Sequence, residues 1–244
     1  LYACKDYVLV IGQSERGTFY GVQTLYQLIQ PKDGRLFIPG VVIKDWPDLK
    51  VRGMHLHFGP RKNRTNVKLV KSMLKNLLAH YKCNMVIFEV ESGINWDCMP
   101  GLHRDKNLRK EDLKEIVKLG EEFYIDVVPQ IQSLGHCEYW LLKEHPEFAA
   151  DAERPYNYDP SNPKVYRFMG RLYDEVLEVF DSNYFHIGHD EVHSGLGKKL
   201  RPKKTDSEWF VEDVKKLRSI LTSKGVGRIM FWRPRSFEAV GNDT

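Results

Sequence analysis

Long apolar runs are missing from this 244-residue sequence, and stretches such as residues 84–90 are far too short to cross a bilayer. The first residues lack a basic start followed by an apolar centre, so no signal peptide is predicted and the compartment stays open. The formal charge of +4 is too small to indicate a nucleic-acid partner. No Cys-x-x-Cys pair occurs, which argues against a disulfide framework or a zinc–thiolate site; the four cysteines are Cys4, Cys83, Cys98 and Cys137.

A change of rhythm near residue 45 divides the chain into two parts. Before it, a β-branched run at residues 7–11, helical spacing of apolar residues at 19–29 and a short strand at 36–38 predict the end of a small α+β domain, residues 1–44. From residue 45 to 244, strands alternate with helices. The predicted strands are residues 53–58, 85–90, 125–129, 184–187 and 228–232, and the predicted helices are residues 67–80, 110–123, 163–180 and 207–224.

Strands that alternate with helices of this length indicate parallel βαβ units. An open doubly wound sheet is the alternative, but no Gly-x-Gly-x-x-Gly turn follows the first strand. We therefore predict an α/β fold, a (β/α)8 barrel of the TIM type. Because eight strands close such a barrel and about five units are present, we expect a barrel that is incomplete at the carboxyl end of this chain.

Polar residues collect where the predicted strands end. In parallel barrels the functional groups lie at the carboxyl ends of the strands and in the loops that follow. Such an excess of histidines, acids and amides at successive strand ends is not what a packed core needs. The segments concerned are His55-Leu56-His57, Glu89-Val90-Glu91, residues 130–136, residues 186–191 and Trp232.

The adjacent acids Asp190 and Glu191 carry the most weight. Two neighbouring carboxylates shift each other's pKa apart, so that one can donate a proton while the other stabilises positive charge. An Asp-Glu pair elsewhere in a chain is usually a solvated helix cap. Here the pair follows an apolar strand and a glycine, which favours a catalytic role.

At this point the sequence resembles a known family. Residues 186–192, His-Ile-Gly-His-Asp-Glu-Val, are similar to the His-x-Gly-Gly-Asp-Glu signature of family 20 β-N-acetylhexosaminidases. Arg52-Gly53 resembles the start of that family's barrel, and residues 128–136 resemble its third strand and Gly-His loop. Residues 17–25 resemble the end of the small domain before the barrel. Glu89-Val90-Glu91 and residues 132–138 are most similar to the hexosaminidase D branch.

The resemblance implies retaining hydrolysis of terminal β-linked N-acetylglucosamine or N-acetylgalactosamine from a glycan or glycoconjugate, without a metal or other cofactor. Family 20 uses the substrate's own acetamido oxygen as the nucleophile. Carried over, Glu191 would be the general acid and base, and Asp190 would orient the acetamido group. The implied substrate-binding residues are Arg52, His136, Trp232 and Glu91.

Several positions depart from the family pattern. His189 stands where the signature has its second glycine, and His57 replaces an aspartate. The family's Asp-Asp after the second strand is absent, with Glu91-Ser92 nearby, and Arg233-Pro234 replaces an acidic residue. These departures leave open a non-catalytic relative that binds sugar.

A metal-dependent amidohydrolase is a further alternative, because His55 and His57 lie two residues apart on one strand and so face the same side. The remaining ligands expected on later strands are not evident. A basic run at residues 198–204 is interpreted as a solvated loop, since no aromatic platform for nucleic acid accompanies it. The oligomeric state is not predicted.

Overall fold

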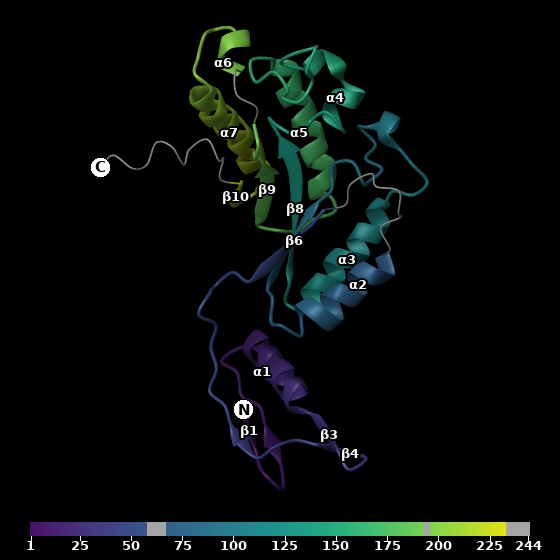
Figure 1. Cartoon of the computed structure of the whole chain (residues 1–244), viewed down its shortest axis with the longest axis vertical. Helices are drawn as coiled ribbons and strands as arrows, with labels where there is room; N and C mark the ends of the chain where they lie inside the picture. Colours follow the sequence, from purple (N-terminus) through teal and green to yellow (C-terminus); the bar gives the residue numbers. More distant parts are fainter. Residues whose placement is uncertain (58–66, 193–195, 233–244) are drawn as a thin grey trace, which may run out of the picture.

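The computed structural model describes residues 1–57, 67–192 and 196–232. The first part of the chain is a small α+β unit, drawn in purple in Figure 1. Ser14 caps its one long helix by accepting a hydrogen bond from the Gly17 amide at 3.1 Å. An antiparallel sheet in the order β2-β1-β5 and a β3-β4 hairpin accompany this helix. The bounds are β1 Tyr2–Ala3, β2 Val8–Leu9, α1 Glu15–Leu28, β3 Gln30–Lys32, β4 Arg35–Phe37 and β5 Val41–Val42.

The second part is built on a five-stranded parallel sheet in the order β6-β7-β8-β9-β10. Each strand lies beside the strand that precedes it in the sequence. A doubly wound sheet would reverse its strand order at a switch point, so this sequential order is that of a barrel. The bounds are β6 Gly53–His57, β7 Met85–Glu89, β8 Asp126–Ser133, β9 Tyr184–Gly188 and β10 Arg228–Met230.

Helices lie on the outer side of this sheet (Figure 1). Amphipathic spacing explains their packing: α5 buries Val165, Phe168 and Leu172, which recur every three or four residues along one face. The long helices are α2 Val67–Met73 with its π-helical continuation Leu74–Leu78, α3 Lys110–Glu122, α5 Pro163–Leu177 and α7 Asp206–Ser223. The short ones are α4 Leu141–Glu144, α6 Leu196–Lys199 and the 3₁₀ turns Pro100–Leu102 and Pro146–Phe148.

The predicted barrel strands and long helices are all present, with boundaries that differ by a few residues. The largest difference is β8, which continues to Ser133 and so carries Gln130 and Gln132 on the strand itself. The short helices and most of the short strands of the first part were not predicted, because segments of two to four residues show no periodicity. Within the described segments, no helix is both long enough and apolar enough to span a bilayer.

The two edges of the sheet approach each other across its concave side. His55 on β6 and Trp232 just after β10 belong to opposite edges, and yet their ring centroids are 5.4 Å apart. A flat sheet of five strands would separate its edges by roughly 19 Å, at about 4.8 Å between neighbouring strands. The sheet is therefore strongly curled, as an arc of a (β/α) barrel must be.

Candidate active site

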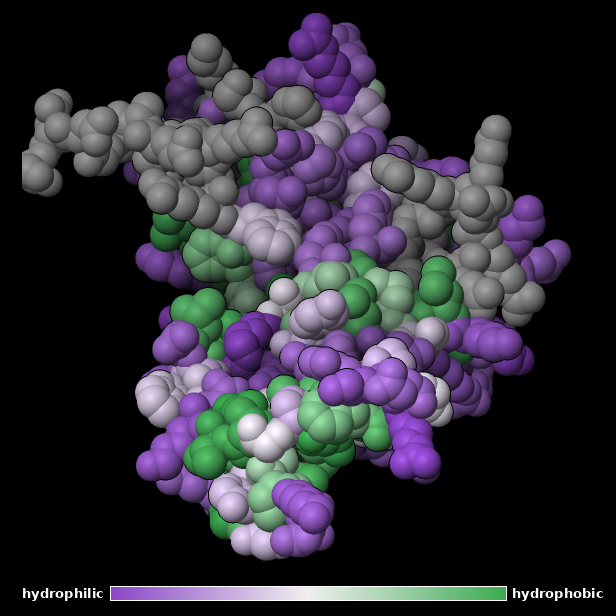
Figure 2. All heavy atoms as spheres, turned by 60° about the horizontal axis from the view of Figure 1, so that its bottom comes forward, coloured by the Kyte–Doolittle hydropathy of each residue, from purple (hydrophilic) through white to green (hydrophobic). Residues whose placement is uncertain are grey.

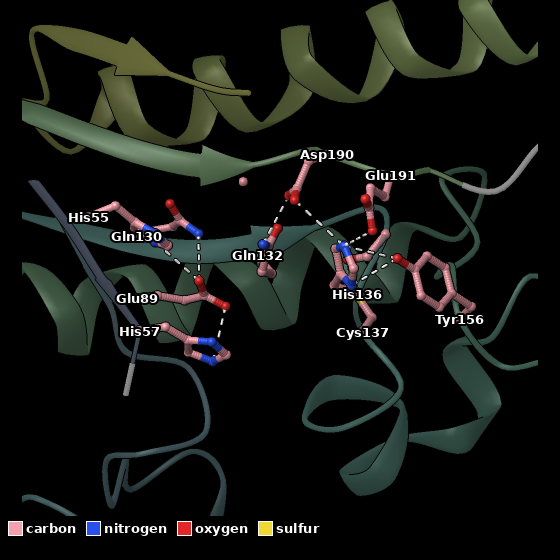
Figure 3. A network of polar contacts seen from close by, with 12 residues as sticks. His55, His57, Glu89, Gln130, Gln132, His136, Cys137, Tyr156, Asp190 and Glu191 are labelled. Atoms are coloured by element: carbon pink, nitrogen blue, oxygen red, sulfur yellow. Dashed lines mark hydrogen bonds and ion pairs between the residues drawn. The ribbon is translucent and has the colours of Figure 1, made fainter. Parts of the chain in front are cut away.

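Asp190 and Glu191 follow β9 in a turn that directs both carboxylates toward His136 (Figure 3). His136 Nε2 lies 3.6 Å from Asp190 Oδ2 and 3.4 Å from Glu191 Oε2. His136 itself follows β8, the strand beside β9. The carboxyl ends of two neighbouring strands thus bring together three of the residues predicted for the site.

The Asp190 carboxylate is fixed by two partners. Gln132 Nε2 donates a hydrogen bond of 3.0 Å to Oδ1, and His136 faces Oδ2. Burial alone would raise the pKa of Asp190, but the contacts from His136 and Gln132 outweigh it and lower the pKa below its usual value. Asp190 is therefore ionised at neutral pH.

Glu191 is the more exposed of the two acids. Its side chain is 56% accessible, against 31% for Asp190. A proton donor must reach the leaving group of a substrate, whereas a group that orients the substrate can lie deeper. The two environments are compatible with the two roles that the family resemblance implies for these residues.

The Tyr156 hydroxyl also contacts His136, at 2.8 Å from Nδ1 and 3.0 Å from Nε2. The pKa of His136 is raised, chiefly by the hydrogen bond to Asp190, against the opposing effect of burial. A protonated His136 therefore places positive charge between Asp190 and Glu191. The pKa of the Tyr156 hydroxyl is raised by burial and then by the nearby acids, so it stays protonated.

A second cluster surrounds Glu89, at the end of β7. His55 Nε2 lies 3.2 Å from Oε2, and His57 Nε2 lies 3.4 Å from Oε1. Gln130 Nε2 donates a hydrogen bond of 3.1 Å to Oε2 (Figure 3). Burial opposes ionisation of Glu89, but the contacts with His55 and its other neighbours outweigh it and lower the pKa.

Glu91 lies deeper than Glu89 and is only 1% exposed. The Tyr139 hydroxyl contacts both acids, at 2.6 Å from Glu91 Oε1 and 3.0 Å from Glu89 Oε1. Burial, and then the charge of Glu89, raise the pKa of Glu91 well above its usual value. Glu91 is therefore a buried acid that ionises less readily than its neighbour, and Glu89 with its two exposed histidines lies nearer to solvent.

Trp232 borders the site after β10. Its backbone N–H donates to the Gly188 carbonyl oxygen at 2.8 Å, which ties it to the start of the turn that carries Asp190. Its ring centroid lies 4.5 Å from that of His186. An aromatic ring at this place supplies an apolar wall of the kind that sugar pockets use.

Arg52 does not join these residues. It precedes β6, so it lies at the amino ends of the strands, whereas the site is at their carboxyl ends. Its guanidinium donates from Nε to the Lys82 carbonyl oxygen at 2.9 Å and from Nη1 to that of Leu49 at 2.7 Å. It also lies over the Tyr20 ring. This arginine fastens the small unit to the floor of the barrel, and its position does not support the sugar-binding role predicted for it.

Gln132 and Glu89 also contribute to the site, although neither is among the predicted site residues. Both lie in the segments at the strand ends, where alternate residues face the same side, so their positions in the sequence indicate that they face the site. Tyr156 lies in a loop without any motif, and nothing in the sequence distinguishes it. Residues 58–66 and 233–244, which include Arg233-Pro234, lie outside the described residues.

The geometry does not favour the amidohydrolase alternative. His55 and His57 both direct Nε2 at the Glu89 carboxylate. Among residues 1–57, 67–192 and 196–232, no group of three or more His, Cys, Asp or Glu is arranged to hold a metal ion.

Comparisons with known proteins identify the family of the chain. The family model described as "Glycosyl hydrolase family 20, catalytic domain" matches residues 50–231, and "Glycosyl hydrolase family 20, domain 2" matches residues 1–46. A β-hexosaminidase from Vibrio furnissii is 30% identical over 75% of this chain and 35% of its own length. A lacto-N-biosidase from Bifidobacterium bifidum is 30% identical over 76% of this chain and 16% of its own length.

Solved structures show the same fold. A chitobiase from Flavobacterium johnsoniae matches with a TM-score of 0.75 and 30% identity, over 87% of this chain and 36% of its own. An N-acetyl-β-hexosaminidase from Streptomyces plicatus, solved with Thio-NAglucal, matches with a TM-score of 0.72 and 25% identity, over 88% and 47%. The chain thus spans less than half the length of each of these relatives. The finer resemblance to the hexosaminidase D branch stays a prediction.

Proposed function

This chain belongs to glycosyl hydrolase family 20, and on that premise we propose that the protein hydrolyses terminal β-linked N-acetylglucosamine or N-acetylgalactosamine residues with retention of configuration. One observation carries the proposal. Asp190 and Glu191 leave β9 side by side, one anchored and ionised, the other accessible, and both face His136.

In the proposed first step, the acetamido oxygen of the substrate attacks the anomeric carbon. The glycosidic bond breaks as Glu191 donates its proton to the leaving oxygen, which gives an oxazolinium intermediate. Asp190 orients the acetamido N–H and stabilises the positive charge that develops on it. Its hydrogen bond from Gln132 supports this role, because an anchored carboxylate does not have to reorganise as charge develops.

In the second step, Glu191 accepts a proton from water as the water oxygen attacks the anomeric carbon and opens the oxazolinium ring. Attack from the side that the leaving group vacated gives overall retention. Trp232 and His136 would contact the bound sugar, and Glu89 with its two histidines would face its hydroxyl groups. We propose that Glu91, which is buried, supports this last group through Tyr139 rather than binding the sugar directly.

The test is hydrolysis of aryl and alkyl β-N-acetylhexosaminides by the full-length protein, with and without a chelator. Glu191→Gln should lose most turnover on alkyl glycosides, whose leaving groups need a proton, and far less on activated aryl glycosides. Asp190→Asn should lose turnover on both kinds. Glu147→Gln changes an acid that pairs with His145 outside the site and serves as the matched control.

Substrate assistance has its own test. An analogue with a 2-hydroxyl group in place of the acetamido group should be nearly inert, and ready cleavage of that analogue would rule the mechanism out. An aryl lacto-N-bioside should be assayed alongside, since one relative is a lacto-N-biosidase. Binding of N-acetylglucosamine without hydrolysis of any of these substrates would identify a non-catalytic relative.

A further inference from the structure

The turn that presents the two acids has an unusual backbone. Gly188, His189 and Glu191 all have positive φ angles, of 69°, 72° and 47°. Left-handed backbone suits glycine and costs other residues about 1 kcal/mol or more. The family signature has a glycine where this chain has His189, so the histidine replaces the residue that fits the turn most easily. The contacts of its side chain show what the histidine adds to the turn.

The His189 ring is fully buried, with a close polar neighbour at each nitrogen and a hydrogen-bond contact at Nδ1 only. Nδ1 lies 2.6 Å from the Ser133 hydroxyl on β8, and that hydroxyl also contacts the Ile187 carbonyl oxygen. Nε2 lies 3.2 Å from Asp213 Oδ2 on α7, within ion-pair distance although the alignment is poor for a hydrogen bond. The ring also packs against Phe210 in a T-shaped arrangement, with centroids 4.7 Å apart.

Asp213 is a rigid anchor for this ring. Its side chain is fully buried on α7, and it also accepts hydrogen bonds from the hydroxyls of Tyr158 at 2.8 Å and Tyr166 at 2.5 Å. A carboxylate with three partners in a low-dielectric setting has little freedom to move. The His189 contacts therefore join the turn to the strand on one side and to the helix on the other.

We propose that His189 is a positioning residue, which clamps the turn after β9 between Asp213 and Ser133 and thereby fixes Asp190 and Glu191 opposite the substrate. The inference rests on the proposed function for its catalytic consequence. His189 is not a catalytic residue, because its buried ring cannot touch a substrate.

His189→Gly tests this directly, since glycine keeps the left-handed backbone and removes only the ring. In the full-length protein it should lower kcat by about tenfold to a hundredfold, the cost of a misplaced catalytic group, while KM changes less than threefold. Asp213→Asn should act in the same direction. The double variant should lose no more than the worse single variant, because His189 and Asp213 form one unit. If the two losses in kcat multiply in the double variant, His189 and Asp213 act independently and the proposed unit is refuted.

Hydrogen exchange supplies a readout that does not depend on turnover. Amides of residues 187–192 should exchange at least tenfold faster in His189→Gly, with α5 unchanged. Glu175→Ala is the matched control, because Glu175 accepts from the Asp97 and Cys98 amides away from the site. That variant should lose stability without a change in kcat or in exchange at the turn.

Wild-type exchange at residues 187–192 in a folded His189→Gly variant would overturn the proposal, whatever the kinetics. If the wild-type protein cleaves no hexosaminide, the proposed function fails. The exchange comparison still decides the positioning role in that case.

Discussion

His186 should make the protein lose stability as the pH falls from 7 to 5. The ring is 1% exposed on β9, and its Nδ1 accepts a hydrogen bond of 3.0 Å from the Gly188 amide. Protonation of Nδ1 would break that bond. Burial, and then the charge of His55, lower the pKa of His186 to about 4.

The size of the effect follows from linkage between protonation and folding. An unfolded histidine titrates near pH 6.5, so between 6.5 and about 4 the unfolded chain binds a proton that the folded protein does not. Stability therefore falls as the pH falls through this window and is fully present above it. At 1.36 kcal/mol for each pKa unit, the full loss is about 3 kcal/mol, and roughly 2 kcal/mol of it occurs between pH 7 and pH 5.

Urea unfolding at pH 7 and at pH 5 measures this loss. His186→Asn keeps an acceptor for the Gly188 amide and removes the titrating ring, so it should lose roughly 2 kcal/mol less than the wild type between the two pH values. His103→Gln, at an exposed position, is the control and should follow the wild type. If His186→Asn loses as much stability as the wild type, the assignment of a buried neutral imidazole is wrong.

Three further predictions concern His136, Glu91 and two helix glycines. His136→Gln should lower kcat/KM by about tenfold or more. It should also remove an alkaline limb of the pH profile of kcat/KM, because His136, whose pKa is raised, loses its positive charge only when the pH passes that pKa. An unchanged pH profile would contradict this. Glu91→Gln should cost less than about 1 kcal/mol at pH 7, since the raised pKa of Glu91 means that folding favours its neutral form and that its contribution to stability is lost as pH rises. A larger loss in urea unfolding would count against this prediction. Gly120→Ala should lower the free energy of unfolding by about 1–3 kcal/mol, because the new Cβ would lie 2.4 Å from a Val127 methyl. Gly170→Ala should instead raise the melting temperature, because its Cβ would lie 3.9 Å from the nearest neighbour and alanine favours the helix.

The barrel could be predicted from the sequence because its elements are long and periodic. Apolar strands such as Met85–Glu89 and amphipathic helices such as Pro163–Leu177 produce signals that few other structures share. The curl of the sheet could not be predicted in this way. The contact that reveals the curl joins His55 and Trp232, which are far apart in the sequence and belong to opposite edges of the five-stranded sheet.

Part of the site could also be predicted from the sequence. Residues two apart on a strand face the same side, so His55 and His57 on β6 form one pair and Gln130 and Gln132 on β8 another. Between them, Glu89 ends β7 and Glu91 lies just beyond it. Their convergence at one end of a parallel sheet follows from topology. Which of the two acids ionises more readily does not follow from topology, since Glu89 and Glu91 both contact Tyr139 and differ in depth of burial and in the histidines that face Glu89.

Arg52 lies away from the site although the motif around it implies a role in binding sugar. A motif assigns a role to a residue type, but a parallel strand has two ends, and only its carboxyl end faces the site. Arg52 comes one residue before β6 and is held by carbonyl oxygens of the preceding loop and of the segment before β7.

Asp213 is the opposite case, a residue that belongs to no motif and yet supports the site. An acid on the buried face of an amphipathic helix does not fit the apolar pattern, yet the burial of Asp213 beside His189 links α7 to the turn of Asp190 and Glu191. Polar residues on an apolar helix face therefore deserve the same scrutiny as those at strand ends, because burying them is costly without a partner.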